Sequence, residues 1–248
     1  MYPDLFISRI EKPNRLWAFP ILGFLIKIII SIPVLIFLMA IGLVASILIS
    51  IANPFSVLFT GRYMDSAYDF FNMYMIYTAK LGFFFFGLTD KYPGFNNFKA
   101  EGFTLNFVKP QMPNRLFAIP LFGLLVRMIL LIPFFIYLYV LNLASYIGML
   151  FSSFAVLFGG KYPESTYELI RDYMRVQLAM TAYLNGISDK YPSFKISMNH
   201  KNIKIALLIA GALWVFFSRT YHPAKPANRN TPMQPVNYTS QTTVPAGY

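Results

Sequence analysis

Cysteine is absent from this chain of 248 residues. Its absence excludes disulfide bonds, thiolate metal sites and cysteine nucleophiles, and it leaves the redox compartment open. Charged residues are scarce at 12%, whereas soluble domains contain about 25%. Because 56% of the residues are hydrophobic, the chain has too little polar surface to coat a water-soluble globule. This composition indicates a protein that is surrounded by lipid.

Acidic residues are few in comparison with basic ones. The 10 Asp and Glu residues stand against 21 Lys and Arg residues, which gives a net charge of +11. The basic residues lie singly at the edges of apolar runs, where they meet lipid phosphates. We therefore expect anionic lipid headgroups as partners, and no nucleic acid.

The sequence also lacks the residue sets that catalysis requires. It contains no Ser/His/Asp set and no glycine-rich loop that would cradle a phosphate. Its two histidines, His200 and His222, have no cysteine or carboxylate at ligand spacing. We expect no enzymatic activity, no cofactor and no metal site.

What the chain does contain is a duplication. The segment Pro13-Asn14-Arg15-Leu16 returns 100 positions later, and the Asp-Lys-Tyr-Pro segment at 90–93 returns at 189–192, after one deleted residue. The match predicts two tandem units. The expected divisions are a lead at 1–12, repeat 1 at 13–95, a polar linker at 96–112, repeat 2 at 113–194, an apolar helix at 195–219 and a disordered tail at 220–248.

Each repeat opens with an apolar run that is too long for one straight span. Spanning requires about 20 apolar residues, and a proline disfavours helix at the residue before it. Pro33 therefore predicts a first helix at 15–31 and a full span at 33–59. Pro133 predicts the same division at 115–131 and 133–158.

One cation interrupts each run, Lys27 in repeat 1 and Arg127 in repeat 2. Lys27 lies about 18 Å along the helix from Arg15. A cation at that depth in a perpendicular span is costly, and a helix lying flat in the interface avoids this cost. Alternatively, the prolines only bend the helix. The sequence leaves both arrangements open.

A turn and a second helix complete each repeat. The turns contain Gly61 and Gly160, and the helices are expected at 65–88 and 164–187. The second of these is polar along one face, so it either spans or lies at the surface. The apolar stretch at 203–217 is short for a span. The expected fold is all-α and polytopic: two repeats, each with a Pro-broken interfacial helix and a helical hairpin, then a single helix and the tail.

Charge counting predicts the orientation. Basic residues cluster at the start and end of each repeat and in the linker, whereas the opposite turns carry only Arg62 and Lys161. The positive-inside rule then places the N-terminus, the linker and both Asp-Lys-Tyr-Pro ends in the cytoplasm. In this arrangement the two repeats run in the same direction.

Two interactions are possible for the charges at these ends. An arginine–carboxylate fork, Arg15 with Asp90 and Arg115 with Asp189, would join the start of each repeat to its end. Alternatively, the arginines hold lipid phosphates while the aspartates face water. The candidate structural or headgroup contacts are Arg15, Lys27, Asp90, Lys91, Arg115, Arg127, Asp189 and Lys190.

Taken together, these motifs resemble a known family. A Pro-containing helix, a long apolar span, a Gly-Arg/Lys-Tyr turn and a closing Asp-Lys-Tyr-Pro-x-Phe are similar to a bacterial membrane family known only as domain of unknown function 4389. The resemblance covers about 13–95 and 113–194. It implies a multi-pass protein of the bacterial inner membrane and supplies no activity or catalytic residues.

The absence of reactive residue sets favours a non-enzymatic accessory or scaffold subunit of an envelope complex. Such a subunit would bind a membrane protein partner or self-associate. The alternative is a transporter or lipid-handling protein that works at the interface between the two repeats, because duplicated units and intramembrane cations are typical of such proteins.

Overall fold

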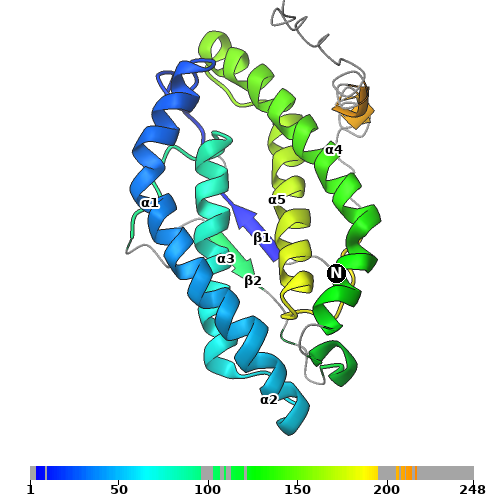
Figure 1. Cartoon of the computed structure of the whole chain (residues 1–248). Coiled ribbons are helices and arrows are strands. Elements are labelled where there is room, and N and C mark those ends of the chain that lie inside the picture. The colour runs from blue at the N-terminus through cyan, green and yellow to red at the C-terminus, as the bar shows by residue number, and fades with distance from the viewer. Residues whose placement is uncertain are drawn as a thin grey trace, which may run out of the picture.

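The computed structural model describes residues 4–8, 10–95, 103–106, 109, 113–119, 122–194, 205–206, 208–209, 211–213 and 216. These residues are mostly helical, with two short strands (Figure 1). The elements are β1 (Asp4–Ile7), α1 (Leu22–Ile47), the π-helical segment η1 (Leu48–Ala52), α2 (Asn53–Thr60), α3 (Asp65–Phe85), β2 (Phe103–Asn106), the 3₁₀ turn η2 (Arg115–Ala118), α4 (Phe122–Gly159) and α5 (Glu164–Leu184).

Each repeat folds into a helical hairpin with one long and one shorter arm. In repeat 1 the long arm is α1–η1–α2 and the short arm is α3; in repeat 2 they are α4 and α5. The short arms begin at Asp65 and Glu164, as expected, and end three residues earlier than expected. They end there because Gly87 and Gly186 take left-handed backbone conformations, with φ of 76° at both. Backbone hydrogen bonds then close each helix in a Schellman motif.

The long arms continue through Pro33 and Pro133, so the expected break between a first helix and a span is wrong. A proline inside a helix removes one hydrogen bond and opens the preceding turn. A hydroxyl from the end of the same repeat lies at that turn: Tyr92 donates to the Ile30 carbonyl at 3.1 Å, and Tyr191 donates to the Leu130 carbonyl at 3.0 Å. Such side-chain donors are one way in which apolar helices tolerate proline.

The two hairpins run in opposite directions, so the expectation of parallel repeats is wrong (Figure 1). The end of repeat 1 lies beside the turn of repeat 2, because the Tyr162 hydroxyl donates to the Phe86 carbonyl at 3.2 Å. The converse contact joins Tyr63, in the turn of repeat 1, to Asp189, at the end of repeat 2, at 3.4 Å. An approximate two-fold axis therefore relates the repeats.

A two-stranded antiparallel sheet, which the all-α expectation missed, lies on this axis. Strand β1 precedes repeat 1 and β2 precedes repeat 2, and Leu5 pairs with its repeat equivalent Leu105. The pairing brings residues 4–7 of the lead and residues 103–106 of the linker side by side. Each strand is four residues long, and the described residues on either side are not strands.

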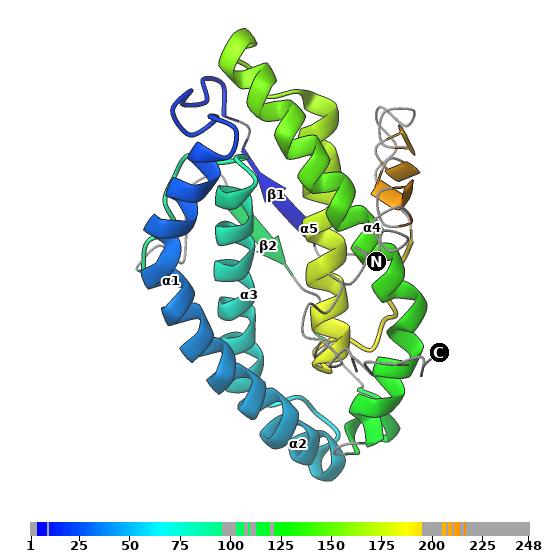
Figure 2. The same cartoon turned by 45° about the horizontal axis from the view of Figure 1, so that its top comes forward.

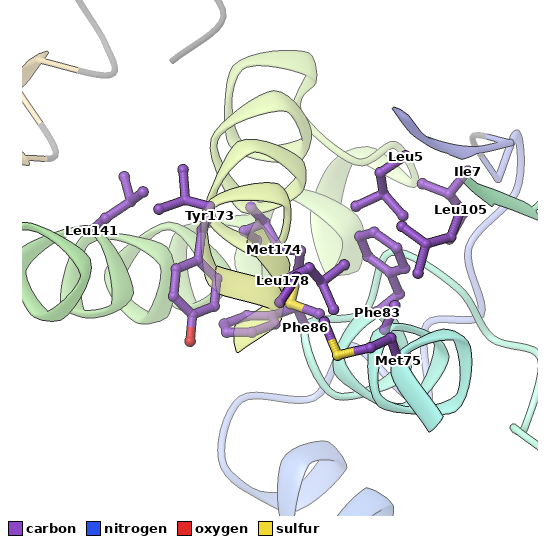
Figure 3. Close-up of a cluster of buried hydrophobic side chains, with 14 of the residues drawn as sticks. Leu5, Ile7, Met75, Phe83, Phe86, Leu105, Leu141, Tyr173, Met174 and Leu178 are labelled. Carbon is purple, nitrogen blue, oxygen red and sulfur yellow. The ribbon is translucent and has the colours of Figure 1, made fainter. Parts of the chain in front are cut away.

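The elements form three layers. The sheet covers one side of the inner pair α3 and α5, and the long arms flank this pair from the other side (Figure 2). Figure 3 shows Leu5, Ile7 and Leu105 approaching Phe83, while Met75 and its equivalent Met174 meet in the same cluster. From the Phe83–Phe86 run, Phe83 and Phe86 belong to this core, and Phe84 is also buried.

The long arms expose apolar side chains over their whole length. Ile29 is 64% exposed, Ile36 63%, Ile136 66% and Phe158 84%. The arms Leu22–Thr60 and Phe122–Gly159, of 39 and 38 residues, are long and apolar enough to cross a membrane. The described positions at 205–206, 208–209, 211–213 and 216 are helical, within the apolar stretch expected at 203–217. The expected tail at 220–248 lies outside the described residues.

Candidate functional site

Two similar pockets lie where the start of one repeat meets the long arm of the other. The Lys27 pocket, of about 270 Å³, is lined among others by Asn14, Trp17, Lys27, Asp90, Ser152 and Tyr162. The Arg127 pocket, of about 280 Å³, is lined among others by Asn114, Phe117, Arg127, Gly186, Asn53 and Tyr63. The repeat relates most of these residues pairwise, such as Asn14 with Asn114, Lys27 with Arg127 and Tyr162 with Tyr63. Both pockets are therefore incomplete within a single repeat.

The two aspartates of the repeated Asp-Lys-Tyr-Pro segment join the start of each repeat to its end. Asp90 accepts a hydrogen bond from the backbone N–H of Asn14 at 2.7 Å, and Asp189 accepts one from Asn114 at 2.9 Å. The expected connection between start and end thus exists. It uses the backbone, however, and not the arginine that follows each asparagine.

Arg15 and Arg115 instead reach the opposite repeat, and the described residues do not contain the forks that were one of the two possibilities for these charges. A Cβ atom added to Gly61 would lie 2.9 Å from Nη2 of Arg115, and one added to Gly160 would lie 3.4 Å from Nη2 of Arg15. Both glycines have a left-handed φ, of 70° and 67°. Each arginine therefore lies against the turn of the other hairpin.

Arg127 is the cation that pairs with Asp189. The residue is 4% exposed, and its Nη2 lies 2.8 Å from the Asp189 carboxylate. Its Nη1 donates to the Tyr183 carbonyl at 2.9 Å. Gly186 leaves room for this guanidinium, since a Cβ there would lie 2.5 Å from Nη1. Buried charges require such pairing because an isolated buried ion is expensive.

Lys27 is buried to the same extent, 4% exposed, but is paired differently. Its ammonium lies 5.5 Å from the centre of the Phe84 ring and close to Gly87. Among the described residues it makes neither a hydrogen bond nor a salt bridge. Asp90 lines the same pocket and attracts the ammonium electrostatically without forming a salt bridge, so the pocket holds an ammonium and a carboxylate that are not in direct contact.

Sequence reasoning did not single out the two turn tyrosines. Tyr63 and Tyr162 are buried, and burial raises the pKa of both phenols above the usual range. Both therefore stay protonated and serve as hydrogen-bond donors between the repeats. Their signal in the sequence is the repeated Gly-Arg/Lys-Tyr segment, which predicts a turn but does not indicate that its tyrosine contacts the other repeat.

The remaining candidates lie outward. Lys91 and Lys190 are exposed. The backbone N–H of each donates a hydrogen bond of 3.2 Å to the side-chain hydroxyl two residues earlier, Thr89 and Ser188 respectively. Of the eight candidate residues, the structure thus brings together Lys27 with Asp90 and Arg127 with Asp189, and it directs Arg15 and Arg115 across the repeat interface. The two lysines face outward.

Comparison with known proteins agrees with this duplicated architecture. The model of a family described as Domain of unknown function (DUF4389) matches residues 22–96 and 123–195. The chain therefore belongs to this family and carries two tandem copies of its domain. No curated protein and no solved structure matches the chain.

Proposed function

We propose that this two-copy member of the family is a non-catalytic protein of the bacterial inner membrane that binds membrane lipid between its repeats. The observation that carries the proposal is the pair of pockets, each of which places a buried cation below apolar walls. Ligand pockets are commonly apolar, with a few polar groups that orient the ligand. Here the polar groups are charged, as lipid headgroups are.

The exposed faces of the long arms support a membrane location. Monomeric soluble proteins rarely expose a large contiguous apolar surface. Here the exposure continues along both arms and includes residues on several sides of each helix, such as Leu25, Ile26 and Ile29 in α1. Hydrocarbon covers such a surface at no cost.

The layered fold favours arms that lie within the membrane plane over arms that cross it upright. At about 1.5 Å per residue, an arm of 39 residues is about 58 Å long, roughly twice the hydrocarbon thickness. In an upright molecule the open-edged sheet would lie at mid-depth, where unpaired backbone groups are not tolerated. We therefore propose that the two-fold axis follows the membrane normal, with the sheet on the water side.

This orientation also accommodates the charges. An axis along the normal gives both repeats the same depth, so Arg15, Lys91, Arg115 and Lys190 reach the same membrane surface. The positive-inside rule then favours the cytoplasmic surface for these residues, the N-terminus and the linker.

The test of lipid binding is native mass spectrometry of the full chain, extracted from bacterial membranes in a mild detergent. We expect retained phospholipid on the wild type. The paired substitutions Ser153→Phe and Ser50→Phe introduce bulk into the two pockets and should remove it. Ser46→Phe, at an exposed position on α1, is the matched control and should retain lipid. Lipid-free wild-type protein, or equal retention in the filled variant, would refute the proposal.

An accessory or scaffold role is the second candidate. It is favoured by a third cavity between the arms, above the inner pair, lined by Ile28 of α1, Met149 of α4 and Gln177 of α5 among others. A partner helix would find both apolar walls and a polar floor there. A protein that co-purifies in fixed stoichiometry, together with lipid-free pockets, would favour this role.

A further inference from the structure

The two pockets are equivalent in fold but differ in how their charges are paired. In the Arg127 pocket the guanidinium lies 2.8 Å from the Asp189 carboxylate. It also donates to a backbone carbonyl at 2.9 Å. The cation and the anion are therefore in direct contact and their charges largely cancel, although Nε of Arg127 makes no hydrogen bond among the described residues.

The Lys27 pocket lacks this direct contact, although the Asp90 carboxylate attracts the ammonium from a longer distance. The Lys27 ammonium makes no salt bridge or hydrogen bond within the described chain, although its side chain is almost fully buried. Its ammonium lies 5.5 Å from the centre of the Phe84 ring, and this cation–π contact compensates only weakly for the lost hydration of the charge. A buried and incompletely paired cation is costly. An anionic ligand group would relieve that cost.

Asp90 restricts the chemistry of such a ligand. Its carboxylate lines the same pocket, and one oxygen is held by the Asn14 N–H at 2.7 Å. A headgroup with a net negative charge would be attracted by Lys27 and repelled by Asp90. A zwitterionic headgroup, which carries a phosphate and an ammonium, complements both side chains.

The size and the surroundings of the pocket fit a headgroup more closely than a whole lipid. About 270 Å³ lies just below the usual size range of pockets that enclose drug-sized ligands. Ile21, Leu25 and Leu150 line the pocket and are 71%, 49% and 44% exposed. They connect it to the exposed apolar faces of both arms, along which acyl chains can lie.

We propose that the Lys27 pocket binds a zwitterionic, amine-bearing phospholipid headgroup. In the Arg127 pocket the cation is already bound to the Asp189 carboxylate, so this pocket does not bind such a headgroup. The lipid phosphate contacts Lys27 and the headgroup ammonium contacts Asp90. This inference rests on the proposed lipid-binding function and sharpens it: one lipid binds per chain, in one of two related pockets.

The experiment uses the full chain in nanodiscs made of equal parts phosphatidylethanolamine and phosphatidylglycerol, followed by native mass spectrometry. We expect one retained phosphatidylethanolamine per chain. Lys27→Met should lower the lipid-bound fraction relative to free protein about tenfold, since a contact to a charged group is lost. Asp90→Asn should remove the preference for phosphatidylethanolamine. Arg62→Met, which removes an exposed charge far from this pocket, is the control and should bind as the wild type does.

A second variant guards against misfolding of Lys27→Met. Lys27→Arg reproduces the residue found in the other repeat and should pair with Asp90 as Arg127 pairs with Asp189. We expect it to keep or raise the melting temperature while it loses the lipid.

The outcomes separate the two proposals. A wild type that retains no lipid refutes the proposed function itself. A wild type that retains lipid while both Lys27 variants retain it equally overturns only the present inference. Two lipids per chain, or a preference for phosphatidylglycerol, also overturns it.

Discussion

At the scale of single residues, this fold depends on polar groups that satisfy backbone atoms in an apolar setting. One pair shows this clearly. Buried Asn53 accepts the Met64 N–H at 3.2 Å, where repeat 2 has Ser152 and Pro163 at the equivalent positions. Proline has no N–H to satisfy, so repeat 2 has no need of the amide. Repeat 1 has Met64 where the Gly-Lys-Tyr-Pro turn of repeat 2 has its proline, and Asn53 satisfies the additional backbone N–H.

Replacing Asp189 and Asp90 by asparagine should lower stability by different amounts, because only Asp189 forms an ion pair with a buried arginine. Asp189→Asn leaves the buried Arg127 without its counter-charge, and we expect it to lower the free energy of unfolding by about 3 kcal/mol. Asp90→Asn keeps an acceptor for Asn14 and should cost about 1 kcal/mol. Thermal melting of both variants in the same detergent measures the difference. Equal losses would contradict the assigned pairing.

The hydroxyls of Tyr92 and Tyr191 should matter because of the prolines. Replacing either by phenylalanine removes a hydrogen bond to a helix carbonyl and should cost about 1 kcal/mol. In a Pro33→Ala background the N–H of residue 33 can bond to the Ile29 carbonyl, and the turn can close so that Val34 N–H reaches the Ile30 carbonyl; Tyr92→Phe should therefore cost less there. A double-mutant cycle on residues 33 and 92 measures this coupling. Additive effects would show that the tyrosine acts independently of the proline.

At the scale of elements, the strand pair is a small sheet with one buried face. Leu5 and Ile7 are buried at 5% and 7% exposure, whereas Phe6 between them is 56% exposed. This alternation is that of a strand packed on one side. Among the described residues, the sheet joins the segment before repeat 1 to the segment before repeat 2 through backbone pairing, so it contributes to the relative orientation of the repeats.

Substitutions in β1 should follow this alternation. Leu5→Ala removes core contacts with the α3–α5 layer and should cost about 2 to 3 kcal/mol. Phe6→Ala, on the outer face, should change stability by about 0.5 kcal/mol or less. Melting curves of the two variants test the register, and comparable losses would contradict the strand pairing.

The sequence predicted the elements better than their assembly. The repeat and the hydrophobic pattern gave both short helices to within three residues, because helical periodicity is local. Helix α1 continues through Pro33, and the Tyr92 hydroxyl that bonds to the turn before this proline lies about 60 residues further along the chain, which local sequence rules do not consider. The backbone partners of Asp90 and Asp189, the N–H groups of Asn14 and Asn114, were not predicted for the same reason. Four-residue strands that pair across 100 positions leave almost no pattern.

At the scale of the whole molecule, the repeat could not reveal the relative direction of its two copies. A duplication guarantees similar folds but leaves their mutual arrangement open. Charge counting favoured parallel repeats because it assumed upright spans. With the axis along the membrane normal, antiparallel hairpins present the same basic residues to one surface, so the charge pattern and the geometry agree.

The absence of native cysteine allows a direct test of this orientation. Lys91→Cys and Lys190→Cys place single thiols at opposite ends of the helix layer, on exposed positions. We expect a membrane-impermeant maleimide to label both from the cytoplasmic side, in inside-out vesicles and not in intact spheroplasts. Labelling of the two thiols from opposite sides would refute the in-plane arrangement and favour upright arms.

The reciprocal architecture has an evolutionary consequence. Half of this chain carries a strand without a mate and half of each pocket, so a relative with a single copy of the domain would need to form a symmetric homodimer to complete either one. Within one chain the two copies need not be identical, and here one copy carries Lys27 where the other carries Arg127. Two separately expressed halves should accordingly reassemble.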